Sequence, residues 1–137
     1  MTDYPKNELR FTLAQRSVAG SKLVNEDAIG IRLPEGSLLK SKGAVAVIAD
    51  GVSAAEAGKE ASETCVHNFL SDYYSTPDSW GVKKSTSQVL TSLNRWLYSQ
   101  GRQFQQAQKG YVSTFSSIIF KSQTAHILQV GDSRGYR

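Results

Sequence analysis

One stretch constrains the fold more than any other: the apolar run at residues 44–49, Ala-Val-Ala-Val-Ile-Ala, which ends directly on Asp50 and Gly51. A short, uninterrupted run of this kind is typical of a strand that is buried on both faces. An aspartate directly after it would lie where the end of the strand meets solvent. We therefore expect a central, fully buried strand with a carboxylate at its exposed end.

The rest of the chain predicts further strands on either side of two helices. Residues 1–10 are polar and predict a loose arm. The expected strands are residues 11–19, 28–33, 114–121 and 125–130, with turns at residues 34–36 and 122–124. Strands separated from a helical pair favour the α+β class, with helices covering antiparallel sheets.

The first helix is predicted over residues 54–74, because Ser53-Ala54-Ala55-Glu56 matches a capping box. Its apolar residues recur every three to four positions and predict a face that packs on a sheet, which makes Cys65 a core thiol. They are Ala57, Ala61, Cys65, Phe69 and Tyr73. After a break at Thr76-Pro77-Asp78, a second helix is expected from about Ser85, frayed near Gly101. Its apolar face comprises Val89, Leu93, Trp96, Leu97 and Phe104.

Composition excludes several classes of protein. The length of 137 residues fits one domain, and 39% hydrophobic residues suffice for a core. The net charge of +4 is dispersed, with Lys83-Lys84 as the one adjacent basic pair, so we expect no nucleic-acid binding. The longest apolar run falls far short of the roughly 18 residues that span a bilayer, so we expect no membrane contact. A single cysteine cannot form an internal disulfide, and we expect a cytoplasmic protein.

Three short acidic clusters lie far apart in the chain: Asn25-Glu26-Asp27, Asp50-Gly51 and Gly131-Asp132-Ser133-Arg134. Carboxylates are hard oxygen ligands suited to Mg²⁺ or Mn²⁺. Each cluster alone has another interpretation, because Asp-Gly is common in turns and the other carboxylates could cap a loop or a β-turn. Taken together, the clusters predict a divalent-metal site.

The order of these motifs, with Lys22 three residues before Asn25, resembles the PP2C-type (PPM) family of metal-dependent serine/threonine protein phosphatases. The resemblance runs from about Arg16 to the end of the chain. It implies an α-β-β-α sandwich that is incomplete at the C-terminus, since the family domain continues through more strands and further metal-binding aspartates. Residues 1–137 would then be the N-terminal portion of a single phosphatase domain. The implied reaction is hydrolysis of phosphoserine or phosphothreonine by attack of a metal-bridging water.

The resemblance also implies the roles of individual residues. Asp50 would bridge two Mg²⁺ or Mn²⁺ ions, the carbonyl of Gly51 would ligate one, and Glu26 and Asp27 would hold metal-bound waters. Asp132 would ligate an additional, weaker ion, which gives two or three ions in the complete domain. Lys22 stands where the family usually has an arginine that grips the substrate phosphate. Because lysine is a compact point charge rather than a planar fork, its grip would be looser, and a merely solvated lysine is the alternative. The expected catalytic residues are Asp50 and Lys22.

Several positions depart from the family pattern. Val52 replaces a histidine proposed as general acid in some members. Ser53-Ala54 stands where a glycine pair is common, and Val112-Ser113-Thr114 replaces the usual glycine before the hydroxyl pair. His67 and His126 have no partners at metal spacing and are expected to be structural. The departures resemble bacterial proteins in which the phosphatase domain precedes a kinase domain, which implies a phosphorylated protein substrate and a fused or cognate kinase. We expect this fragment alone to be inactive; the alternative is a phosphatase-like regulatory or binding module without turnover.

Overall fold

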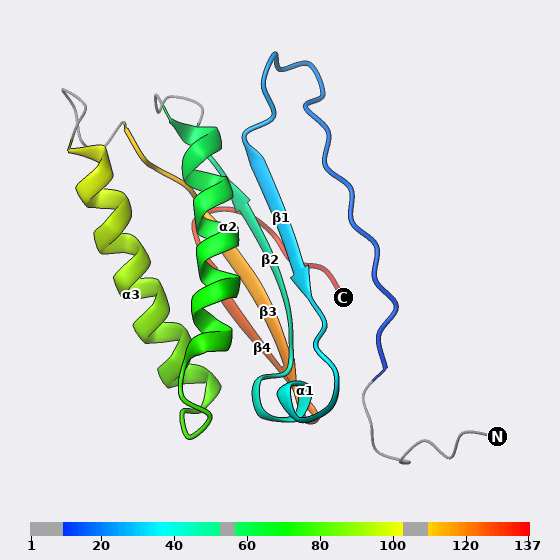
Figure 1. The fold of residues 1–137 in the computed structure, drawn as a ribbon. Helices are drawn as coiled ribbons and strands as arrows, with labels where there is room; N and C mark the ends of the chain where they lie inside the picture. The colour runs from blue at the N-terminus through cyan, green and yellow to red at the C-terminus, as the bar shows by residue number, and fades with distance from the viewer. Residues whose placement is uncertain (1–9, 53–56, 103–109) are drawn as a thin grey trace.

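The computed structural model describes residues 10–52, 57–102 and 110–137, which form one helical layer against one antiparallel sheet (Figure 1). The elements in chain order are β1 (Asp27–Arg32), α1 (Gly36–Lys42), β2 (Ala44–Asp50), α2 (Gly58–Ser75), α3 (Val82–Gly101), β3 (Phe115–Lys121) and β4 (Thr124–Val130). The predicted α+β class is confirmed. None of the helices in these residues is both long and apolar enough to cross a membrane.

The four strands lie in the order β1-β2-β3-β4, and every neighbouring pair is antiparallel. The apolar run predicted as the central strand is β2, which pairs with β1 on one side and with β3 on the other. A tight turn at Ser122 and Gln123 joins β3 to β4, with a positive φ of 56° at Ser122. This hairpin confirms the prediction for residues 114–130 to within one residue at each boundary.

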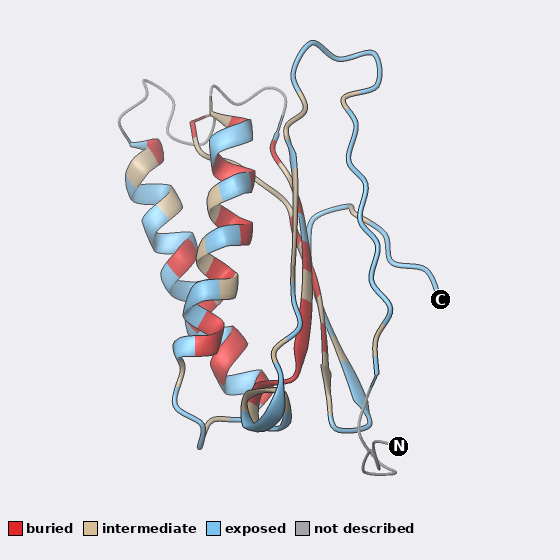
Figure 2. Cartoon of the chain, turned by 45° about the vertical axis from the view of Figure 1, so that its right-hand side comes forward, coloured by how far each residue is buried: buried red, intermediate tan, exposed pale blue. Residues whose placement is uncertain are grey.

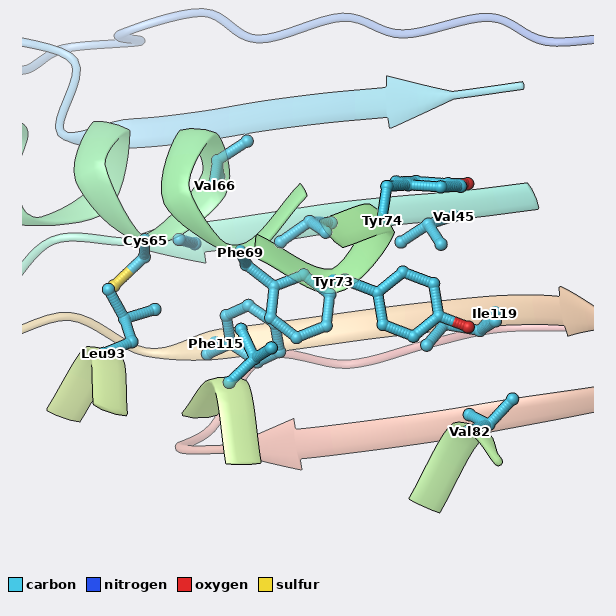
Figure 3. Close-up of a cluster of buried hydrophobic side chains, with 13 residues drawn as sticks. Val45, Cys65, Val66, Phe69, Tyr73, Tyr74, Val82, Leu93, Phe115 and Ile119 are labelled. Atoms are coloured by element: carbon cyan, nitrogen blue, oxygen red, sulfur yellow. The ribbon is translucent and has the colours of Figure 1, made fainter. Parts of the chain in front are cut away.

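The two long helices cover one face of the sheet (Figures 1 and 2). Their buried side chains meet inward-facing residues of the strands, which alternate along each strand as the pleat requires. In the core, the ring of Phe69 stacks on Tyr73 at 5.9 Å between centroids and meets Phe115 at 4.7 Å (Figure 3). The residues that pack there include Val45, Val47, Ala49, Cys65, Phe69, Tyr73, Leu93, Phe115 and Ile119. The predicted apolar face of α2 is thus confirmed, apart from Ala57, which precedes the helix and is only partly buried.

The other face of the sheet has no helix over it in the described part of the chain (Figure 2). Ile48 of β2 lies on this face and is 47% exposed, and Ile127 of β4 is 74% exposed. The prediction that β2 is buried on both faces was therefore wrong for this side chain. The N-terminal segment runs along the same face, where the ring of Phe11 contacts Phe120 at 5.4 Å between centroids.

Four further expectations differ from the structure. The strand expected at residues 11–19 does not form, since this segment pairs with none of the strands β1–β4. The turn at residues 34–36 leads instead into α1, a seven-residue helix that the sequence pattern did not predict. The second long helix begins at Val82 rather than Ser85. Trp96, which was expected on its apolar face, is 41% exposed. Gly101, where fraying was expected, is the buried last residue of the helix. The helix predicted from residue 54 begins at Gly58; the predicted capping box and Phe104 lie outside the described residues.

Candidate metal and phosphate site

Two carboxylates face each other across the β1–β2 pair. Asp27 is the first residue of β1, Asp50 is the last residue of β2, and their Cα atoms are register partners. Because the two strands are antiparallel, the start of one and the end of the other lie at the same end of the sheet (Figure 1). The two acidic clusters, which are 23 residues apart in sequence, are thus brought together by strand pairing.

The environment of Asp50 disfavours its ionised form. Partial burial raises the pKa of this carboxyl most, followed by a hydrogen bond with the Asp27 side chain and by the negative charges of Asp27 and Asp132; the positive charge of Lys22 acts in the opposite direction. A neighbouring carboxylate disfavours the ionised form of Asp50, whereas a bound cation would favour it. Three of the other residues predicted for the site therefore lie within electrostatic reach of Asp50: Lys22, Asp27 and Asp132.

Gly51 lies in a tightly packed position next to this pair. Its N–H donates to the carbonyl of Glu26 at 2.9 Å, and it pairs with Ser113 as an isolated bridge. A side chain on Gly51 would overlap the backbone carbonyl of Gly58 at the start of α2, so a residue larger than glycine does not fit. The strand end and the helix start thus approach each other closely at this point.

The Glu26 side chain lies on the α2 side of the sheet. Its carbonyl accepts hydrogen bonds from the N–H of Gly51 and from the Ser62 hydroxyl at 2.6 Å. Its carboxylate lies against the Cα of Gly58, so closely that a side chain on that glycine would collide with it. Successive side chains of a strand point to opposite faces, which separates the Glu26 carboxylate from that of Asp27. The structure therefore brings Asp27 and Asp50 together but directs Glu26 towards the first residue of α2.

The donor chemistry of the Asp27–Asp50 pair suits a hard divalent cation, because both groups are carboxylates and their mutual repulsion would be relieved by positive charge. Within residues 10–52, 57–102 and 110–137, however, no group of three or more His, Cys, Asp or Glu side chains converges as a metal site. The described residues thus supply two adjoining carboxylates rather than a complete coordination sphere.

Comparison with protein families identifies the kind of domain. The family model described as Protein phosphatase 2C matches residues 14–135. The chain belongs to the protein phosphatase 2C family. No curated protein matches the sequence. The resemblance seen in the sequence motifs is thereby confirmed, and membership of this family indicates a phosphatase domain.

The protein phosphatase 2C motifs include the hydroxyl pair Ser113-Thr114 but did not reveal that it contacts Asp50. Thr114, the residue just before β3, hydrogen-bonds to the backbone of Asp50, and its hydroxyl also lies 3.3 Å from that of Ser133. Its neighbour Ser113 donates to the Asp50 carbonyl at 3.3 Å. The signal in the sequence was the hydroxyl pair Ser113-Thr114 directly before an apolar strand. Such a pair alone does not indicate that it bonds to Asp50, which lies 64 positions earlier in the chain.

Proposed function

We propose that the intact protein is a Mg²⁺- or Mn²⁺-dependent serine/threonine protein phosphatase. The observation that carries this proposal is the opposed pair Asp27 and Asp50 at one end of the sheet, with Asp132 and Lys22 in electrostatic reach. Family membership supports the phosphatase activity itself. The metal dependence is supported by the carboxylate chemistry of the pair.

In this proposal, Asp27 and Asp50 hold the metal ions together with the Gly51 carbonyl, and Asp132 contributes to a further ion. Bound Mg²⁺ or Mn²⁺ supplies an activated water for direct attack on phosphorus and charge compensation for the transferring phosphoryl group. Lys22 attracts and orients the substrate phosphate through its positive charge. The Glu26 carbonyl accepts hydrogen bonds from both Gly51 and Ser62 and so links the end of β2 to α2. Its carboxylate would hold a metal-bound water.

We also propose that residues 1–137 are the N-terminal portion of a single phosphatase domain, and that this portion alone turns over little substrate. Two features support this proposal: the two-carboxylate ligand set among the described residues, and the exposed isoleucines on the uncovered sheet face. The proposed substrates are phosphorylated proteins in the cytoplasm. A fused or cognate kinase, as in bacterial signalling proteins of this family, is the proposed partner.

The test is hydrolysis of a phosphothreonine peptide, with and without Mn²⁺, by the chain extended past Arg137. The Asp50→Asn variant should lose nearly all turnover, since it removes a ligand charge. Asp72→Asn is the matched control, because Asp72 is exposed on α2 and distant in sequence from every motif of the site. Full activity of Asp50→Asn would contradict the proposal.

A binding module without turnover is the second candidate. It is favoured by Lys22 in place of the family's arginine and by the two-carboxylate ligand set. The same assay separates the two candidates. A folded extended chain that binds a phosphothreonine peptide but releases no phosphate with Mn²⁺ would support the binding module, whereas turnover that requires Asp50 would exclude it.

A further inference from the structure

One side chain, that of Thr114, contacts both of the loops that carry the proposed ligands. It lies between Asp50 at the end of β2 and the segment from Gly131 to Ser133, which contains Asp132. We propose that Thr114 is a positioning residue that sets where Asp132 lies relative to Asp50, and that it thereby sets the affinity for the divalent cation. This inference rests on the proposed function.

On the β2 side, Thr114 holds the backbone of Asp50 from two directions. The Thr114 hydroxyl accepts a hydrogen bond from the Asp50 N–H at 3.0 Å, and the Thr114 N–H donates to the Asp50 carbonyl at 2.8 Å. The last paired residues of the regular ladder are Ile48 and Ser116, so Asp50 lies beyond it. Thr114 therefore extends the pairing to the residue whose carboxylate is needed at the site.

On the other side, both branches of the Thr114 side chain contact the Asp132 segment. Its hydroxyl oxygen lies 3.3 Å from that of Ser133. Since this oxygen accepts from the Asp50 N–H, its own proton is available for Ser133. Its methyl group packs against Gly131, where an added Cβ would lie only 2.7 Å from Thr114 Cγ2. Gly131 has a φ of +107°, a conformation that favours glycine and turns the chain at this contact.

These contacts matter because Asp50 and Asp132 repel each other when both are ionised. The contacts of Thr114 oppose this repulsion by linking the two segments. A neutral residue that bonds to both segments keeps the ligands close without lowering their negative charge. Groups that orient metal ligands in this indirect way commonly change metal affinity by about 10–100-fold when removed.

The two branches can be tested separately. Thr114→Ser keeps the hydroxyl and removes the methyl, whereas Thr114→Val keeps the shape and removes the hydroxyl. Ser133→Ala removes the hydroxyl contact with the Asp132 segment and keeps the contact of the Thr114 methyl group with Gly131. Thr91→Val is the matched control, since Thr91 is an exposed α3 residue whose hydroxyl bonds to the Ser87 carbonyl of its own helix.

The measurement is Mn²⁺ affinity of the chain extended past Arg137, by electron paramagnetic resonance of free Mn²⁺, together with thermal unfolding without metal. We expect Thr114→Val to weaken binding by about tenfold or more, Ser133→Ala to weaken it by severalfold, and Thr114→Ser and Thr91→Val to stay within about threefold of wild type. A purely structural role would lower the unfolding temperature without this pattern of affinities.

Wild-type affinity in a folded Thr114→Val variant would overturn the inference while leaving the proposed function intact, provided that Asp50→Asn abolishes binding. Should Thr114→Val fail to fold, Ser133→Ala decides, and unchanged affinity in that variant overturns the inference. Absence of Mn²⁺ binding by the folded wild-type chain would reject the proposed function and the inference with it.

Discussion

Asp27 and Asp50 are directly opposed in the register of β1 and β2, so two carboxylates lie next to each other at one end of the sheet. Strand pairs with like charges directly opposite each other are destabilising. The arrangement therefore costs the apo protein stability, which a bound cation would restore. Sites that bind charged ligands commonly have this conflict between folding and function.

The first prediction is that Asp50→Asn stabilises the 137-residue chain at neutral pH when divalent cations are chelated. Because the pKa of Asp50 is raised, the folded state holds the proton of this carboxyl more tightly than the unfolded state does. The folded state therefore loses stability as pH rises from the unfolded pKa of Asp50 through its folded pKa. Removing the charge should raise the unfolding temperature by a few degrees at pH 7. The gain should shrink as pH falls towards about 4, where an unfolded aspartate becomes protonated.

Asp72→Asn serves as the control for this measurement, since it removes one negative charge from an exposed position on α2. Thermal unfolding followed by circular dichroism at several pH values would detect the difference. An Asp50→Asn variant that is less stable than wild type at pH 7 in chelator would show that the carboxylate contributes to folding rather than opposing it.

Local patterns predicted the parts of the fold that local chemistry determines. The apolar run of β2 and the β3–β4 hairpin follow from strand periodicity and a short polar turn, and the position of Asp50 follows from the end of the run. The face of α2 that carries Cys65 and Phe69 follows from helical spacing.

What the patterns missed depends on contacts between distant residues. The seven-residue α1 is too short to be stable alone. Its last residue, Lys42, hydrogen-bonds to Thr76 and Pro77, which are distant in the sequence. The pattern at residues 11–19 predicts a strand, but a strand forms only where another strand pairs with it, and none does here. Likewise, nothing near Thr114 in the sequence indicates that its hydroxyl bonds to Asp50.

The second prediction concerns Lys42, whose side chain is buried at 1% exposure despite its charge. Its ammonium group donates to the Thr76 hydroxyl at 2.6 Å and to the Pro77 carbonyl at 3.0 Å, which joins α1 to the segment after α2. Lys42→Met keeps most of the aliphatic stem but leaves these acceptors without their donor. We expect a loss of about 1–3 kcal/mol in the free energy of unfolding.

Urea unfolding of Lys42→Met beside Lys40→Met measures this loss, because Lys40 is an exposed residue of the same helix. The control should stay within about 0.5 kcal/mol of wild type. Equal stability of the two variants would mean that the buried ammonium contributes no net free energy.

The third prediction concerns Gly30 in β1, which faces α2. A Cβ at this position would lie 2.5 Å from Val66 Cγ1 and 2.8 Å from Leu70 Cδ1. Gly30→Ala should therefore push α2 away from the sheet and cost about 1–3 kcal/mol of stability. Gly135→Ala is the control, since no atom lies within 4 Å of its added Cβ. Urea unfolding with an unchanged midpoint for Gly30→Ala would show that the two side chains can repack without cost.

The last prediction concerns Tyr73, which is 1% exposed and donates its hydroxyl proton to the Lys42 carbonyl at 2.7 Å. Burial raises its pKa from 10.0 to about 12. Between these values the unfolded tyrosine loses its proton while the folded one keeps it, so stability falls as pH rises. Tyr73→Phe should cost about 1 kcal/mol at pH 7 through the lost hydrogen bond.

The same variant should show a shallower loss of stability between pH 10 and 12, because one of the protons that links folding to pH is gone. A decline remains, since burial also raises the pKa of Tyr74. Tyr98→Phe, at a position 63% exposed on α3, should follow the wild-type curve. Urea unfolding across this range distinguishes the two variants. Parallel alkaline curves for Tyr73→Phe and wild type would rule out Tyr73 as a source of the pH dependence.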